Sequence, residues 1–403
     1  MSLSTRGCFV RAVWTATIIY GPRDSRTQET ISVDRLALKF MEDLTNSFGP
    51  SGFESDSLDI IRGYVSRFSD RVYSDKLGTL MFDKRGTADS PTVLVPGHVD
   101  EVGFIVSSIN KQGFLTFNPL GWWSDQVLLG QRVRVRTKKG DIAGFIASKP
   151  PHLLPPDERT KVVVMKKMFI DIGASNEDEA KEMGVRVGNP VAPESRFSTI
   201  RKRVFKDGKH KGEDVIAIGK AFDNRIGAWT AAEVVRRLVE RRIKHPNKVI
   251  GAATTLEEEG LRGARTAAYI TKPDACITID ADVAGDVPGI EESEASAKMG
   301  YGPSITTYDS SMIPNQGLLE LVLEVAEKNK IPYQLSQVVA DTDAGVIHMA
   351  NAGCPSIALG VPARHVHSHV GFFSMADAEN SIKLVVNVIK RLDKDTVDGF
   401  SRK

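Results

Sequence analysis

Residues 91–101 read PTVLVPGHVDE, and this stretch decides the fold. Its first half has the length and the β-branched content of a buried strand, and it ends in a histidine followed by two acids. Similar short apolar runs return after residue 215, in VIAIG, VIGAATTL, ACITID and SIALGVP, with helical periodicity between them. Because helices alternate with buried strands, we expect an α/β sheet.

The middle of the chain has a different pattern of apolar and polar residues. Residues 107–198 contain short alternating runs such as RVRVRT and a proline cluster, KPPHLLPPDE, which are typical of a separate β-rich unit. We therefore expect one α/β domain, made of 33–106 and 199–403, that is interrupted by this insertion. Residues 1–32 are unlike the rest and are expected to form a loose extension.

Composition excludes several classes of function. The 403 residues carry 53 Lys and Arg against 51 Asp and Glu, so the net charge of 53 − 51 = +2 indicates neither a nucleic-acid nor a membrane partner. No apolar run approaches the roughly 18 residues of a membrane span. The three cysteines, Cys8, Cys276 and Cys354, form no CxxC pair, which argues against a disulfide framework and a thiolate zinc site and favours a cytoplasmic protein.

Acids and histidines stand where the predicted strands end. Open α/β sheets bind their ligands at the carboxyl ends of the strands, so these side chains are expected to meet there. Asp223 is a further acid, between VIAIGKAF and a helical pattern. The residues at the four strand ends are His98, Asp100, Glu101, Glu257, Glu258, Glu259, Asp280, His365, His367 and His369.

Several carboxylates in one cleft would repel one another unless cations neutralise them. Oxygen and imidazole ligands without thiolate suit zinc, cobalt or manganese, and a carboxylate between two metals can bridge them. A carboxylate that is not a ligand can serve as a base, so hydrolysis is the expected reaction class. Each motif alone has a simpler explanation, since Asp223 could be a helix N-cap and the acidic triplet a solvated turn. Spacing alone does not select a ligand among the three histidines at 365, 367 and 369.

Six ordered motifs resemble the M42 family of cocatalytic metallo-aminopeptidases. They are GHVDEVG (97–103), KAFDNRIG (220–227), TLEEEGLRGA (255–264), IDADVAGDVPG (279–289), DTDAGVIHMANAGCPS (341–356) and VPARHVHS (361–368). SKPPHLL (148–154) and FIDIGA (169–174), inside the insertion, are similar as well. The resemblance runs from about Leu36 to Leu392. It implies a three-layer αβα zinc-exopeptidase-like domain with an inserted, barrel-like dimerisation domain that also covers the cleft.

The resemblance also implies a role for each matching position. Two divalent ions, Zn²⁺, Co²⁺ or Mn²⁺, would generate a bridging hydroxide that cleaves the N-terminal residue from a peptide, with Glu257 as general acid and base. Asp223 resembles the bridging carboxylate and Asp100 the acid that orients an imidazole ligand. The implied terminal ligands are His98 and Asp280 on one metal, and Glu258 and His367 on the other.

Three positions depart from the family pattern. Glu259 stands where an apolar residue is usual, and we expect it to face solvent. His365 replaces a common aromatic residue, and Asp341 replaces a frequent glycine near Asp343. His365, Asp341 and Asp343 are expected to line the substrate pocket.

The resemblance further implies dimers gathered into a twelve-subunit shell that admits unfolded peptides. Trp122 and Trp123 could contribute to an interface or to an ordinary core. Two other functions remain open: a glycosidase that uses a pair of carboxylates such as Glu257 and Asp280, and a scaffold without catalysis. The glycosidase would have no use for two histidine ligands.

Overall fold

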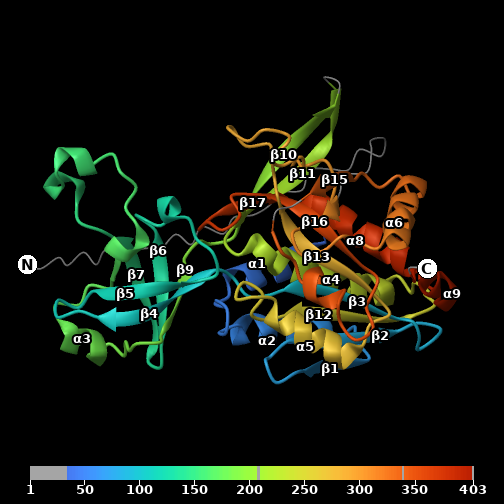
Figure 1. Cartoon of the computed structure of the whole chain (residues 1–403), viewed down its shortest axis with the longest axis horizontal. Coiled ribbons are helices and arrows are strands. Elements are labelled where there is room, and N and C mark those ends of the chain that lie inside the picture. The colour runs from blue at the N-terminus through green and yellow to red at the C-terminus, as the bar shows by residue number, and fades with distance from the viewer. Residues whose placement is uncertain (1–33, 207–208, 338–339, 402–403) are drawn as a thin grey trace, which may run out of the picture.

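The computed structural model describes residues 34–206, 209–337 and 340–401. Figure 1 shows two parts, a large α/β body and a smaller β-rich part beside it. The extension that the sequence predicts at residues 1–32 lies outside the described residues.

A single mixed sheet forms the centre of the body. Its strands run in the order β1-β2-β12-β3-β13-β16-β17-β11-β10, and β14 and β15 pair beside β16. The four central strands β12, β3, β13 and β16 are parallel, so their carboxyl ends lie along one edge. The bounds are β1 (Arg71–Ser74), β2 (Leu80–Arg85), β3 (Thr92–His98), β10 (Ser198–Lys206), β11 (Lys209–Gly219), β12 (Lys248–Thr254), β13 (Ala275–Val283), β14 (Ser304–Tyr308), β15 (Gln334–Gln337), β16 (Ser356–Arg364) and β17 (Gly371–Ser374).

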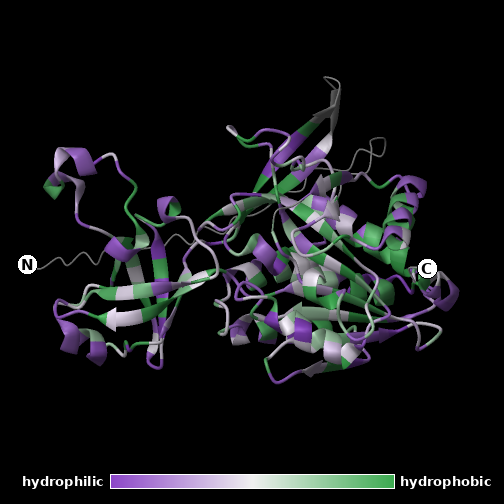
Figure 2. Cartoon of the chain, in the orientation of Figure 1, coloured by the Kyte–Doolittle hydropathy of each residue, from purple (hydrophilic) through white to green (hydrophobic). Residues whose placement is uncertain are grey.

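Helices cover both faces of this sheet, which confirms the three-layer αβα prediction. Alternate residues of β3 show the division: Val93 and Val95 pack into the core beneath α1, α2, α4, α6 and α8, whereas Leu94 packs with α5 and α7. Figure 2 shows hydrophobic residues concentrated where helices meet the sheet. The helices are α1 (Arg35–Asn46), α2 (Ser55–Val65), α4 (Phe222–Glu240), α5 (Arg262–Thr271), α6 (Gln316–Lys328), α7 (Ala344–Ile347), α8 (Met375–Ile389) and α9 (Lys394–Asp398).

The inserted part is a closed barrel with its own core. Its strands follow the order β4-β5-β8-β7-β6-β9, and a separate cluster of buried side chains, including Phe104 and Val133, fills it. The barrel contains β4 (Gly103–Ile109), β5 (Leu115–Leu120), β6 (Arg132–Thr137), β7 (Gly140–Ala147), β8 (Phe169–Asp171) and β9 (Pro190–Pro193), together with the short helix α3 (Glu177–Glu182).

The barrel strands therefore run from residue 103 to residue 193, whereas the sequence places the insertion at 107–198. The difference arises because β4 begins only five residues after His98, the last residue of β3. The barrel thus starts immediately beside the predicted histidine ligand. In the part of the chain that the structure describes, no helix combines the length and the apolar character that a membrane crossing requires.

A buried charged cluster joins the start of α4 to the end of β3. The Glu101 carboxylate accepts hydrogen bonds from Lys220 Nζ at 2.6 Å and from Arg225 Nη2 at 3.0 Å, and all three side chains are at most 1% exposed. Arg225 also donates to backbone carbonyls at the end of α1, including that of Leu44 at 2.7 Å. Burial lowers the pKa of Lys220 to about 7, against the opposing effect of the Glu101 charge. This cluster fixes the two segments that carry His98 and Asp223.

Removing the shared carboxylate should destabilise the protein strongly. A Glu101→Ala variant leaves two buried cationic side chains without their common partner, and we expect a loss of about 3–5 kcal/mol in the free energy of unfolding. Urea denaturation followed by circular dichroism measures the change. The matched control is Glu324→Ala, because Glu324 forms an exposed pair with Arg391 at 3.0 Å, and such pairs contribute about 0–1 kcal/mol. Equal losses in the two variants would contradict this account of the cluster.

Candidate active site

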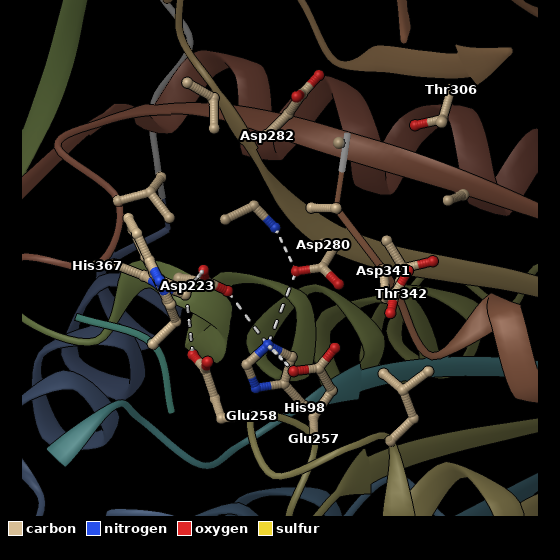
Figure 3. Close-up of a pocket in the computed structure, with 18 of the residues that line it drawn as sticks. His98, Asp223, Glu257, Glu258, Asp280, Asp282, Thr306, Asp341, Thr342 and His367 are labelled. Carbon is tan, nitrogen blue, oxygen red and sulfur yellow. Dashed lines mark hydrogen bonds and ion pairs between the residues drawn. The ribbon is translucent and has the colours of Figure 1, made fainter. Parts of the chain in front are cut away.

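Seven of the predicted side chains meet at one edge of the sheet, beyond the carboxyl ends of the parallel strands. Figure 3 shows all of them except Asp100. His98 is the last residue of β3, and Asp280 lies within β13. The loop after β3 supplies Asp100, the loops after β12 and β16 supply three more, and the first turn of α4 supplies Asp223. The seven residues are His98, Asp100, Asp223, Glu257, Glu258, Asp280 and His367.

Asp223 lies between the two imidazoles. Its Oδ1 is 3.2 Å from His98 Nε2, and its Oδ2 is 3.1 Å from His367 Nε2. Asp223 has non-helical backbone angles, and it is the neighbouring Asn224 whose side chain accepts a hydrogen bond from the Gly227 N–H, at 2.8 Å. The side chain of Asp223 is thus free of a capping role, and each of its oxygens points to a different imidazole.

Each imidazole has a further carboxylate nearby. Asp280 Oδ1 is 3.9 Å from His98 Nε2, and Glu258 Oε1 is 3.5 Å from His367 Nε2. Two overlapping groups of donor atoms can each hold a metal ion, one with His98, Glu257 and Asp280 and one with His98, Asp223 and Glu258. Among the described residues, Glu258 Oε1 is buried and has no hydrogen-bond partner. A buried acceptor of this kind, in a set of nitrogen and oxygen donors, fits a divalent cation such as zinc, cobalt or manganese.

The electrostatics of the site also favour bound cations. Burial, and then the charges of neighbouring acids, raise the pKa of Glu257 and of Asp280 well above the usual carboxylate range. Burial would lower the pKa of His367, but the nearby carboxylates of Asp223 and Glu258 raise it to about 11. Carboxylates so close together strongly attract positive charge, whether from imidazolium groups or from metal ions.

Asp100 organises the two sides of the site at once. Its Oδ1 lies 3.4 Å from His98 Nδ1, so it can orient the imidazole. The same carboxylate accepts hydrogen bonds from the backbone N–H groups of Glu257 and Glu258, both at 3.1 Å, and from Ser51 Oγ at 2.7 Å. One fully buried acid thus holds both a candidate ligand and the loop that carries the candidate base.

A second buried acid, Glu54, extends this support, and the sequence analysis missed it. Glu54 Oε1 accepts hydrogen bonds from the N–H groups of Leu256, at 3.1 Å, and Gly52, at 2.7 Å. Burial, with the nearby charge of Asp100, raises the pKa of Glu54 to about 7. In the sequence, GPSG (49–52) reads only as a helix stop, and no short spacing connects it to Leu256.

The cluster opens into a cleft with a volume of about 610 Å³, large enough for a small molecule or the end of a peptide. Asp341, predicted at the pocket, lines this cleft and accepts a hydrogen bond from Ser310 Oγ at 2.7 Å. His365 lines a smaller neighbouring hollow of about 20 Å³. Asp343 is buried, accepts a hydrogen bond from Thr254 Oγ1, and does not belong to the described lining of the cleft.

Glu259 is partly exposed, and it also makes a contact that the sequence analysis did not predict. Its Oε1 accepts a hydrogen bond from the N–H of Gly121 at 3.0 Å, and its side chain is 31% exposed. Gly121 directly follows barrel strand β5, so the third glutamate of the triplet joins the barrel to the loop that carries the candidate base. The sequence gives no sign of this contact because the two residues are 138 positions apart.

Comparison with known proteins agrees with this geometry. The family model for the M42 glutamyl aminopeptidases matches residues 78–384. A glutamyl aminopeptidase from Lactococcus lactis is 31% identical over 357 residues, which cover 88% of this chain and 96% of the relative.

Solved structures show the same fold. A TET aminopeptidase from a marine sediment archaeon, Thaumarchaeota archaeon SCGC AB-539-E09, is 54% identical with a TM-score of 0.85, over 91% of this chain and 99% of that one. The TET1 peptidase of Pyrococcus horikoshii, described as assembling into a tetrahedron or a large octahedral shell, is 29% identical with a TM-score of 0.75, over 88% of this chain and 100% of that one. The chain therefore belongs to the M42 family of aminopeptidases.

Proposed function

We propose that this aminopeptidase works with two metal ions, which share Asp223 and hydrolyse the first peptide bond of a peptide. The observation that carries the proposal is the position of Asp223, whose two oxygens lie 3.2 and 3.1 Å from two different imidazoles. A carboxylate that bridges two metals about 3.5–4 Å apart requires this divided orientation.

The proposed ligands divide evenly between the two ions. His98 and Asp280 would bind one ion, and His367 and Glu258 would bind the other, because the nitrogen and the oxygen of each pair lie within 4 Å of each other. The ions are Zn²⁺, Co²⁺ or Mn²⁺, which accept the same nitrogen and oxygen ligands. When bound, they lower the pKa of a water molecule and polarise the carbonyl group of the substrate.

Glu257 is the proposed general base and acid. It lies beside the pair formed by His98 and Asp280, with its Oε2 3.6 Å from His98 Nε2, and it lines the cleft. The family resemblance, rather than this distance, supports the role of base instead of ligand. Glu257 takes a proton from the attacking water and delivers it to the nitrogen of the leaving peptide. Asp100 and Glu54 hold the backbone around Glu257 in place, because they accept hydrogen bonds from three successive N–H groups, those of Leu256, Glu257 and Glu258.

The competing functions account for less of the site. A glycosidase needs two carboxylates about the scissile bond and leaves the two imidazoles beside Asp223 without a role. A silent scaffold does not need a complete donor set at the bottom of an open cleft. Each alternative predicts a different response to the removal of metal.

We also propose that the chain acts on peptides as a self-assembled particle, a homododecamer built from dimers in which the barrel makes the dimer contact. The tetrahedral assembly described for the P. horikoshii TET1 peptidase and the dodecamer in the solved structure of PhTET1-12s support this. On the barrel side, the segment between β7 and β8 exposes the apolar side chains of Leu153, Val162 and Val164.

Removing the metal should abolish activity. Dialysis against a chelator is expected to stop cleavage of aminoacyl-anilides, and Zn²⁺, Co²⁺ or Mn²⁺ should restore it. Metal analysis should give two ions per chain in the parent protein and at most one in Asp223→Ala, because the shared ligand is lost. Cellulose hydrolysis that survives the chelator would support the glycosidase instead, and a metal-loaded protein without peptidase activity would support the scaffold.

Replacing the base should separate catalysis from metal binding. We expect Glu257→Gln to lower kcat by about 10²- to 10⁴-fold, the usual contribution of general acid–base catalysis, while two ions remain bound. Steady-state kinetics and metal analysis of one preparation measure both quantities. The control is Glu292→Gln, whose side chain is 78% exposed. A Glu257→Gln variant as fast as the parent would refute the proposed role.

The proposed assembly can be tested by sedimentation velocity. The parent should sediment as a particle of twelve chains of 44.1 kDa each. A triple substitution of Leu153, Val162 and Val164 by serine should shift it to smaller species, because it removes exposed apolar side chains from the barrel. A parent that sediments as a monomer would contradict the proposal.

A further inference from the structure

Two adjacent tryptophans in the barrel have opposite environments. Trp123 is 6% exposed, its ring stacks on Phe104 with centroids 4.9 Å apart, and its Nε1 donates to the Gly103 carbonyl at 3.1 Å. Trp122 is 69% exposed and lines the active-site cleft, with its ring centroid 6.0 Å from that of His367. Trp123 therefore anchors the loop in the barrel core, and Trp122 is presented at the cleft.

The backbone before Trp122 packs closely against the loop that carries Glu258 and Glu259. Gly121 has φ +77°, and a Cβ there would lie 2.7 Å from Val102 Cγ1 and 3.0 Å from Glu258 Oε2. The Gly121 N–H donates to Glu259 Oε1 at 3.0 Å. A residue with a side chain would not fit at this position. The backbone of Trp122 is thus held on one side by the Trp123 anchor and on the other by the contact between Gly121 and Glu259.

The shape of the cleft indicates which part of a peptide reaches Trp122. Asp282, Thr306 and Leu359 line a buried inner wall, whereas Trp122 is largely exposed and so belongs to the mouth. An aminopeptidase must enclose the first residue of its substrate and let the rest of the chain leave toward solvent. The residue after the scissile bond therefore passes the mouth, where an exposed indole offers a large apolar surface beside the site.

We propose that Trp122 is a substrate-binding residue that contacts the residue after the scissile bond and favours large aromatic or aliphatic side chains there. Glu259 is the positioning residue that holds this loop through Gly121. The inference rests on the proposed aminopeptidase function and adds a preference at the second residue of the peptide.

The test compares two tripeptides on the metal-loaded enzyme. Both begin with the residue that the parent releases fastest and end in glycine, and their second residue is phenylalanine in one and glycine in the other. We expect the KM of the parent to be about tenfold lower for the phenylalanine peptide, the factor that burial of roughly 50 Å² of apolar surface supplies. In Trp122→Ala this KM ratio should fall to less than twofold, and Trp122→Phe should keep most of it.

The role of Glu259 has its own pair of variants. Glu259→Gln keeps an acceptor oxygen for the Gly121 N–H and should retain the KM ratio, whereas Glu259→Ala removes the acceptor and should reduce it. Tyr269→Ala is the matched control for Trp122→Ala, since Tyr269 is an aromatic residue on α5 that is 73% exposed and lies outside the described lining of the cleft. Equal ratios in Glu259→Gln and Glu259→Ala would overturn the positioning role.

Two failures can be told apart. A parent that cleaves both peptides with the same KM, or a Trp122→Ala variant with an undiminished ratio, would overturn this inference and leave the aminopeptidase function intact. A parent that releases no N-terminal residue from either peptide would overturn the proposed function, and this inference with it.

Discussion

The repulsion between buried carboxylates at one edge of the sheet is the constraint on which the rest of the site depends. Asp223, Glu257, Glu258 and Asp280 converge there, and burial raises the free energy of each negative charge. Two divalent ions supply four positive charges against the three carboxylates that we propose as ligands. In the proposed function the remaining positive charge would lower the pKa of a bound water molecule, so the arrangement that is costly without cations would support hydrolysis with them.

The fold holds this repulsive group together by fixing backbone rather than side chains alone. Parallel strands bring their carboxyl ends to one edge, and Asp100 and Glu54 then bind the N–H groups of the loop that carries Glu257. Beneath them, Glu101 binds Lys220 and Arg225 and so connects the segments of His98 and Asp223. Buried charged groups of this kind contribute little net stability, but removing one partner is costly, which makes them effective at fixing geometry.

The sequence predicted those parts of the protein that depend on local pattern. The apolar run that ends at His98, the alternation of helices and strands and the β-rich insertion follow from periodicity, and the three-layer body and the barrel confirm the fold class. The motifs selected the residues that meet at the site, but the choice of His367 among three histidines required the family resemblance. Ser51, Glu54 and the Gly121–Glu259 contact could not be predicted, because they join segments far apart in the chain through single hydrogen bonds.

The barrel contacts the loop that carries Glu257 and Glu258, and it also begins close to His98. The first barrel strand starts five residues after His98, and the loop at Gly121 returns to touch Glu258 and Glu259. The barrel is thus attached to the site at two points that lie on opposite ligand pairs, one next to His98 and one next to Glu258. A movement of the barrel would displace a wall of the cleft and the backbone beside the site together, because Trp122 lines the cleft and the adjacent Gly121 is hydrogen-bonded to Glu259. The segment Gly121–Trp122 therefore links the proposed substrate contact at the cleft mouth to the position of the loop that carries Glu257 and Glu258. Glu259 strengthens this link, because an apolar residue at position 259 could not accept the hydrogen bond from Gly121.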